Sequence, residues 1–125
     1  MELNLTLLAR MVGRLRPQAR ILTATSGPEA IQLCREMRIN CIFMDIHMPL
    51  MSGIEACQAV RNLSRHYLRL VIVALSATSM SEAAIAEAGF SRLLLKPVLA
   101  DEIELVIAHA ERRQREEPSN GGGRD

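Results

Sequence analysis

The sequence predicts an α/β fold, a doubly wound parallel sheet whose strands alternate with helices. Two observations carry this prediction. The apolar runs CIFMD (residues 41–45) and LVIVAL (residues 70–75) show no polar alternation, which is typical of strands covered on both faces. Segments with helical spacing or helix-capping signals separate the apolar runs. Strands connected through helices in this way form right-handed βαβ units.

The N-terminal part of the chain should hold a helix, a strand and a second helix. Residues 3–15 place apolar side chains at helical spacing, and Pro17 should end that helix. Residues 20–25 contain ILTAT, a β-favouring run that we predict as a strand. Ser26 and Glu29 have the spacing of a capping box, so a helix should follow and extend to about residue 37.

The same alternation continues through the C-terminal part. Ser52 and Glu55 form a second capping-box signature, which predicts a helix to about residue 64. Ser79 and Glu82 form a third, and Gly89 suits the left-handed position after the end of that helix.

The last predicted elements are a short strand at residues 93–95 and a helix that Asp101 should cap and that runs to about residue 113. Residues 114–125 are polar and rich in glycine, as disordered segments are. We therefore predict one domain over residues 1–113 and a disordered polar tail over residues 114–125.

Composition and charge narrow the class of protein. The net charge of +1 favours neither nucleic acid nor an anionic membrane surface as a partner. There is no apolar run of roughly 20 residues and no signal-peptide pattern. Cys34, Cys41 and Cys57 are odd in number and lack metal-ligand spacing, which favours reduced, core-filling thiols and a cytoplasmic location.

Three polar residues directly follow the predicted strands: Asp45, Ser76 and Lys96. The carboxyl ends of parallel strands meet at one edge of the sheet, where α/β proteins place their working site. Each residue taken alone is better explained as a turn residue, a locally bonded hydroxyl or a solvated surface charge. Their joint occurrence at three strand ends favours a functional site.

The chemistry available to this trio is phosphoryl transfer. A carboxylate such as Asp45 can attack phosphorus and hold the group as an acyl phosphate. Lys96 can neutralise charge on the phosphoryl oxygens, and the hydroxyl of Ser76 can donate to one of them. Mg²⁺ usually neutralises the remaining negative charge of the phosphoryl oxygens. Asp45 and the backbone carbonyl of His47 are candidate ligands for this ion.

The segments CIFMDIHMPLMSGIEACQAVR, ALSAT and LLLKPV, in this order, resemble the signature segments of response-regulator receiver domains. The likeness is strongest to receivers attached to hybrid sensor histidine kinases, and it extends from about residue 3 to residue 110. It implies a flavodoxin-like receiver fold in which Asp45 is the phosphoacceptor, assisted by Ser76 and Lys96. The same resemblance implies Mg²⁺ as the cofactor, with the His47 carbonyl as one ligand. It implies supporting roles for Pro49 and Gly53 in the following loop, for Ala77 beside the phosphoryl site, and for Pro97 as a cis proline.

The implied function is that of a phosphoacceptor in a two-component system or phosphorelay. The implied partner is a histidine kinase or histidine phosphotransfer domain, which would donate the phosphoryl group from a phosphohistidine. Beyond its own phosphorylation and dephosphorylation, no enzymatic activity is expected.

The sequence departs from the family pattern at its beginning. Receivers open with a strand that ends in a pair of acidic residues, which bind Mg²⁺, and this strand and its acidic pair have no counterpart here. In the family's strand order, 2-1-3-4-5, that strand would lie between residues 20–25 and 41–45. We therefore expect weakened Mg²⁺ binding, with Glu2 a poorly fixed substitute acid. Unpaired strand edges should also favour homodimerisation or strand exchange.

Two smaller departures concern signalling. Leu93 occupies the position that the family usually gives to a switch Tyr or Phe, and the segment from Ser76 to Lys96 is about two residues short. The missing acidic pair and Leu93 favour an alternative function, a degenerate receiver that acts as a phosphorylation-independent protein-interaction module.

Two further classes fit poorly. An enzyme of the haloacid-dehalogenase type would need a second aspartate where His47 stands, and no cap domain is present in 125 residues. A DNA-binding effector would need a basic helix-turn-helix after the domain, which the sequence lacks.

Overall fold

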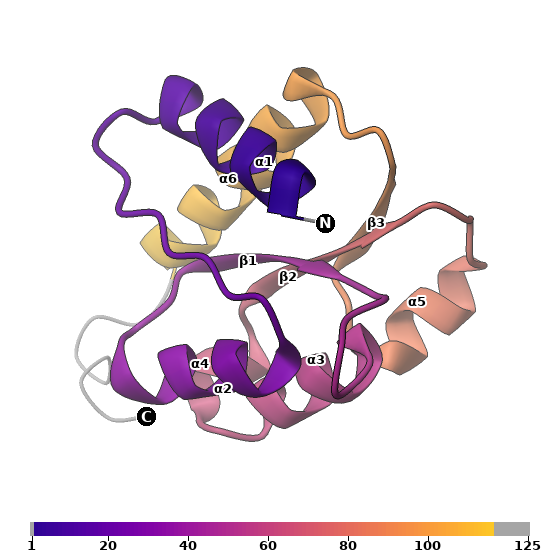
Figure 1. The fold of residues 1–125 in the computed structure, drawn as a ribbon. Helices are drawn as coiled ribbons and strands as arrows, with labels where there is room; N and C mark the ends of the chain where they lie inside the picture. Colours follow the sequence, from indigo (N-terminus) through magenta and orange to yellow (C-terminus); the bar gives the residue numbers. More distant parts are fainter. Residues whose placement is uncertain (1, 117–125) are drawn as a thin grey trace.

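The computed structural model describes residues 2–116, and it describes side chains from residue 7 onward (Figure 1). Its elements follow in the order α1 (Glu2–Leu15), α2 (Gly27–Glu36), β1 (Cys41–Asp45), α3 (Gly53–Arg61), α4 (Arg65–Leu68), β2 (Val71–Ser76), α5 (Glu82–Ala88), β3 (Arg92–Leu95) and α6 (Ala100–Glu116). The predicted α/β class and the parallel sheet are confirmed.

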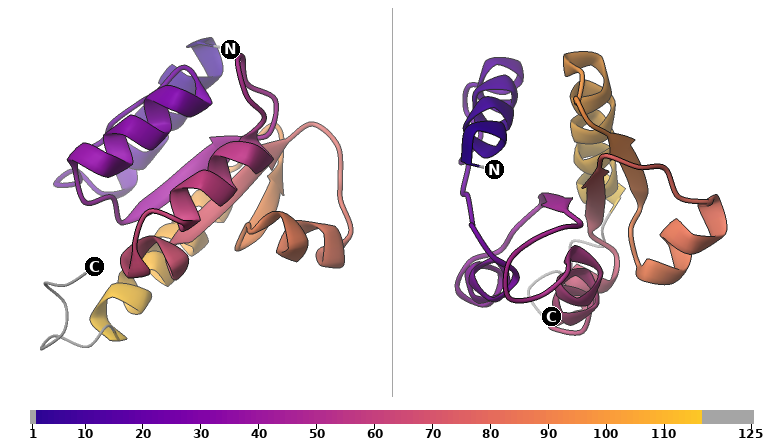
Figure 2. Two further views of the ribbon diagram at one scale, coloured as in Figure 1. Left: turned by 90° about the horizontal axis from the view of Figure 1, so that it is seen from below. Right: turned by 45° about the vertical axis from the view of Figure 1, so that its right-hand side comes forward.

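The three strands form one parallel sheet in the order β1-β2-β3. Helices α1 and α6 lie on one face, and α2, α3 and α4 lie on the other, as both figures show (Figures 1 and 2). Helix α5 lies beside β3 at the edge of the sheet. Every residue of the central strand β2 is buried, as a strand covered by helices on both faces should be.

Side chains of the two sheet faces build two separate clusters of the apolar core. One cluster packs Met44 and Ile72 of the sheet against Ile31 of α2 and Val60 of α3. The other packs Val73 and Leu94 against Val106 and Ala110 of α6, with Phe43 and Leu8 at its margin. The sheet therefore separates a larger core under α2 and α3 from a smaller one under α1 and α6.

Several local predictions are confirmed. Helix α1 ends at Leu15, two residues before Pro17. Ser52 and Glu55 form a complete capping box at the start of α3. Gly89 follows α5 with a φ of 99°, the left-handed conformation that the sequence predicted.

The predicted strand at residues 20–25 is wrong. This segment is extended, but it belongs to no sheet among residues 2–116. A β-favouring composition alone does not make a strand, because strand ladders need a neighbour to hydrogen-bond. Within residues 2–116, no strand lies between this segment and β1.

The other corrections concern helix ends. Ser81, not Ser79, caps α5 by accepting a hydrogen bond from the backbone N–H of Ala84. Asp101 lies inside the first turn of α6 and does not cap it, since α6 begins at Ala100. The short helix α4 was not predicted, and α6 runs on to Glu116, three residues past the predicted end.

The end of the predicted tail, residues 117–125, lies outside the described residues, and the domain boundary stays a prediction. Among the helices of residues 2–116, none combines the length and the apolar character that crossing a bilayer requires.

Candidate functional site

The three strand-end residues predicted from the sequence come together at the carboxyl edge of the sheet. Asp45 is the last residue of β1 and pairs in register with Leu75, next to Ser76. Ser76 is the last residue of β2, and its carbonyl accepts a hydrogen bond of 2.8 Å from the backbone N–H of Lys96. Parallel pairing thus brings these residues, from three separate sequence segments, to one edge.

Asp45 and Lys96 form a direct ion pair across the top of β2. The Nζ atom of Lys96 lies 2.5 Å from Oδ2 of Asp45. The side chains of Lys96 and Asp45 are only 26% and 20% exposed, so bulk water screens their attraction less than at an open surface. The second oxygen, Oδ1, accepts a 3.0 Å hydrogen bond from the backbone N–H of His47. The carboxylate is therefore fixed through both of its oxygens.

Ser76 is 2% exposed, and its hydroxyl is engaged with the loop that follows it. Its Oγ donates to the carbonyl of Thr78 at 2.8 Å and accepts from the backbone N–H of Thr78 at 3.1 Å. The hydroxyl must rotate away from the Thr78 carbonyl before it can donate to a phosphoryl oxygen. The sequence did not indicate that Thr78 is the hydrogen-bond partner of Ser76, although Thr78 lies inside the quoted ALSAT segment.

Gly53 supports the Asp45 backbone at a point where no side chain fits. A Cβ atom on Gly53 would lie 2.4 Å from the carbonyl oxygen of Asp45 and 2.7 Å from the Cα of Ile46. The backbone N–H of Gly53 instead donates a 2.7 Å hydrogen bond to the Ile46 carbonyl. Glycine is required here by close approach of the backbone.

In the loop between Asp45 and Gly53, the residues His47 and Pro49 are exposed. Leu50 in this loop is 85% exposed and has a φ of 74°, a conformation that costs energy for a leucine. No sequence pattern predicted Leu50, because leucine is not a residue that favours positive φ.

The remaining predicted residues take the following places. Ala77 is exposed directly after β2, and the Lys96–Pro97 peptide bond is cis, as the resemblance implied. Leu93, at the position of the expected switch aromatic, pairs in register with Ala74 and packs against the larger core cluster.

The donor set for a divalent cation is small. Within residues 2–116, no three His, Cys, Asp or Glu side chains group as metal ligands would. Asp45 and the His47 carbonyl fit a Mg²⁺ ion that keeps most of its waters, since Mg²⁺ is often held by one or two carboxylates plus substrate phosphates. Lys96 competes for one oxygen of that carboxylate. Glu2, the substitute acid considered above, has no described side chain.

Comparison with known proteins gives a consistent result. The sequence model of the response regulator receiver domain matches residues 2–108. Sensor histidine kinase RcsC of Salmonella typhi is 32% identical over 88% of this chain, and signal transduction histidine-protein kinase BarA of Escherichia coli K12 is 35% identical over 58% of it. The chain spans only 11% and 8% of the length of these two relatives.

Solved structures share the fold. The receiver domain of sensor histidine kinase PA1611 from Pseudomonas aeruginosa, described with a magnesium ion in its active site cleft, aligns with a TM-score of 0.76 at 23% identity, covering 87% of this chain and 88% of that one. Chemotaxis protein CheY4 of Vibrio cholerae aligns with a TM-score of 0.72 at 23% identity, covering 86% and 92% of the two chains.

The family match covers most of the chain and includes the strand-end trio at the carboxyl edge. This protein therefore belongs to the response regulator receiver domain family.

Proposed function

We propose that this chain acts as the phosphoacceptor of a phosphorelay, with Asp45 receiving the phosphoryl group from a phosphohistidine. The observation that carries the proposal is the Asp45–Lys96 ion pair at the carboxyl edge, beside the strand end of Ser76. The relationship to hybrid sensor kinases supports this function over a phosphorylation-independent interaction module.

In the proposed reaction an oxygen of the Asp45 carboxylate attacks the phosphorus atom. A bond forms between that oxygen and phosphorus while the bond from phosphorus to the donor histidine nitrogen breaks, and the histidine keeps the electron pair. Lys96 moves its ammonium from the free carboxylate to the equatorial phosphoryl oxygens, where negative charge concentrates. Ser76 rotates its hydroxyl from the Thr78 carbonyl to donate to another of these oxygens.

Mg²⁺ is proposed as the cofactor, held by Asp45 and the carbonyl of His47. Its chemistry would be to neutralise oxygens of the incoming phosphoryl group. With a single protein carboxylate in the described site, the ion would bind weakly in the absence of phosphate.

The proposed donor is a histidine kinase or a histidine phosphotransfer domain, and the proposed location is the cytoplasm. Homodimerisation or strand exchange, expected from the unpaired strand edges, is also a proposal.

The test is labelling with acetyl phosphate and Mg²⁺, read by intact mass, on this chain and its Asp45→Asn variant. Asp101→Asn is the matched control, because Asp101 is an exposed carboxylate in the first turn of α6 that shares no hydrogen bond or ion pair with Asp45 or Lys96 among the described residues. We expect one added phosphoryl group on the native chain and on the Asp101→Asn variant, and none on Asp45→Asn. Chelation of Mg²⁺ should abolish labelling. Labelling of Asp45→Asn, or no labelling of a chain shown to be folded, would contradict the proposal.

A further inference from the structure

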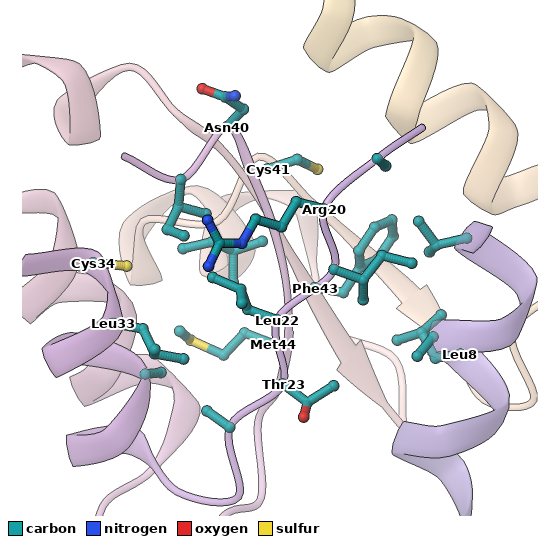
Figure 3. Close-up of a pocket in the computed structure, with 18 of the residues that line it drawn as sticks. Leu8, Arg20, Leu22, Thr23, Leu33, Cys34, Asn40, Cys41, Phe43 and Met44 are labelled. Atoms are coloured by element: carbon teal, nitrogen blue, oxygen red, sulfur yellow. The ribbon is translucent and has the colours of Figure 1, made fainter. Parts of the chain in front are cut away.

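Arginines gather at the amino edge of the sheet, the end of the strands opposite Asp45. Figures 1 and 2 show α4 and the C-terminal end of α6 at this end, on opposite faces of the sheet. The amino-edge patch consists of the following residues, all exposed except the half-buried last one: Arg65, Leu68, Arg69, Arg92, Arg112 and Arg113. The patch is separate from the hollow beside β1, which Leu22 and Phe43 line (Figure 3), because no residue of the patch lines that hollow.

Two guanidinium groups from opposite faces of the sheet bind the same short stretch of backbone at this edge. Arg61 of α3 donates hydrogen bonds to the carbonyls of Leu68 at 3.3 Å and Leu70 at 2.5 Å. Arg113 of α6 donates to the carbonyl of Arg69, which lies between them, at 2.9 Å. The carbonyls are neutral groups, so they satisfy the N–H donors without cancelling the positive charges.

Among the described residues, no ion pair joins an arginine of the patch to a carboxylate. The half-buried His109 of α6 responds to the resulting field. Burial is the first cause that lowers the pKa of His109, and three positive charges of the patch lower it further, those of Arg113, Arg112 and Arg92. Glu116 opposes them. The electrostatic potential at this end of the molecule is therefore positive, which attracts anions.

Helix ends explain only part of this arrangement of charges. Arg113 lies in the last turn of α6, where a cation stabilises the helix dipole. Arg92, in contrast, begins strand β3, and strands have only small dipoles. Leu94 packs against α6, so Arg92, two residues earlier on the strand, projects from the same face of the sheet. Its charge therefore adds to the patch without stabilising a helix end.

An exposed leucine lies among these arginines. Leu68 is 59% exposed and belongs to neither core cluster. It follows Arg65 by three residues on α4, a spacing that places both side chains on one face of the helix, and Arg69 comes directly after it. A single partner that covers this surface would bury the leucine and neutralise the arginines together.

We propose that the amino-edge patch binds an acidic segment of a partner polypeptide, in which carboxylates surround an apolar residue. The carboxylates would pair with the arginines, whose planar guanidinium groups suit bidentate binding of this anion. The apolar residue of the segment would cover Leu68. Asp45 ends β1 at the other edge of the sheet, so a bound segment would leave the phosphoacceptor open to its donor.

Other anionic partners fit this surface less well. Single-stranded nucleic acids stack their bases on aromatic side chains, whereas the one tyrosine of the chain, Tyr67 of α4, is only 5% exposed. An anionic membrane binds a broad apolar helix face, whereas α4 has four residues and one exposed leucine. The sequence of residues 117–125 contains two acids, Glu117 and Asp125, but no large apolar residue that could cover Leu68.

The test is fluorescence anisotropy of the whole chain with a labelled short peptide in which glutamates surround two leucines. One control peptide replaces the leucines by serines, and a second replaces the glutamates by glutamines. At low salt we expect the acidic leucine peptide to bind, the serine peptide to bind roughly fivefold more weakly, and the glutamine peptide not to bind. The affinity should fall as the salt concentration rises, because salt screens charge pairs at a surface.

A double variant tests the arginines of the patch. Arg69→Gln combined with Arg112→Gln should weaken binding of the leucine peptide about tenfold. Neither side chain makes a hydrogen bond or an ion pair among the described residues, so the double variant should unfold at the native Tm. Arg10→Gln combined with Arg14→Gln is the matched control, because these exposed arginines of α1 lie outside the patch and their removal lowers the net charge equally.

Two leucine variants test the apolar contact. Leu68→Ser should weaken binding of the leucine peptide roughly fivefold. Leu99→Ser is the matched control, since Leu99 is also 59% exposed but lies outside the patch, directly before α6. Asp45→Asn should bind the peptide as the native chain does, so the patch and the phosphoacceptor function can fail separately.

Four outcomes would overturn the proposal. The first is no binding of the leucine peptide at low salt by a chain shown to be folded. The second is an equal loss of affinity in the two double variants, which would assign binding to net charge alone. The third is equal binding of the serine peptide, which would remove the role of Leu68. The fourth is tighter binding, through the same arginines, of an oligonucleotide of equal charge or of vesicles containing phosphatidylserine, which would assign the patch to another class of partner.

Discussion

Replacing Gly53 with alanine should both destabilise the fold and damage the site. The added Cβ would lie 2.4 Å from the Asp45 carbonyl oxygen and 2.7 Å from the Ile46 Cα, and both are backbone atoms that cannot rotate away. Overpacking costs about 1–3 kcal/mol in cores, and the close backbone contacts place this case at the upper end. Alanine recovers up to about 1 kcal/mol of helix propensity. We expect a net loss of roughly 2 kcal/mol, since the two effects oppose each other.

The assay is urea and thermal unfolding of Gly53→Ala, with Gly13→Ala as the matched control. Gly13 is also helical, but its Cβ would meet only a side-chain atom of Ile21 at an ordinary 3.6 Å. Gly13→Ala should therefore gain about 0.5–1 kcal/mol. A loss of 2 kcal/mol should lower the Tm of Gly53→Ala by roughly 8 °C. The reasoning is refuted if Gly53→Ala unfolds at the native temperature and labels normally with acetyl phosphate.

Three further predictions concern hydrogen bonds and titrating groups. Arg61 donates to the carbonyls of Gly89, Tyr67 and Leu70, so Arg61→Ala should cost about 2–4 kcal/mol in urea unfolding, and Arg61→Lys should cost less. Burial raises the pKa of the Cys41 thiol to about 12, so the folded state holds its proton after the unfolded state has lost it. Stability should therefore fall as pH rises from about 9 to 12, by at most about 1.4 kcal/mol per pH unit, and Cys41→Ala should flatten that slope in alkaline urea titrations. Hydrogen bonds from Arg16 lower the pKa values of Glu104 and Glu111, so the α1–α6 contact should be fully present above their unfolded values and weaken as pH falls through the folded ones. Hydrogen exchange of the backbone amides of α1, measured at low pH and in high salt, reports this loss. The Arg16→Gln variant should show no such pH dependence.

Local signals in the sequence predicted local structure well. The Ser52–Glu55 capping box and the Gly89 helix end depend on hydrogen bonds and dihedral angles within a few residues, so they can be recognised without the fold. The N-cap residue of α5 was harder to predict, because Ser79 and Ser81 both lie shortly before Glu82. Residues 82–88 form the helix, and that choice of register depends on packing that the sequence does not display.

Non-local features were predicted only in part. The alternating pattern placed Asp45, Ser76 and Lys96 at one edge, since parallel strands align their carboxyl ends. It could not predict the 2.5 Å contact between Lys96 and Asp45, which depends on side-chain conformations. Residues 20–25 were wrongly predicted as a strand from their β-favouring composition. Such a composition gives a strand only where a neighbouring strand exists to pair with it.

The phosphoacceptor depends on contacts from several parts of the fold. Asp45 ends β1, which pairs with β2 in the part of the chain that the structure describes, and β2 itself is fully buried between two neighbours. The position of Asp45 therefore depends on the ladder to β2, the close approach of Gly53 and the ion pair to Lys96. Each of these contacts restrains a different part of the residue: the ladder and Gly53 hold its backbone, and Lys96 holds its carboxylate. Together they narrow the range of positions from which Asp45 can attack phosphorus, so loss of any one of them should slow labelling even where the fold survives.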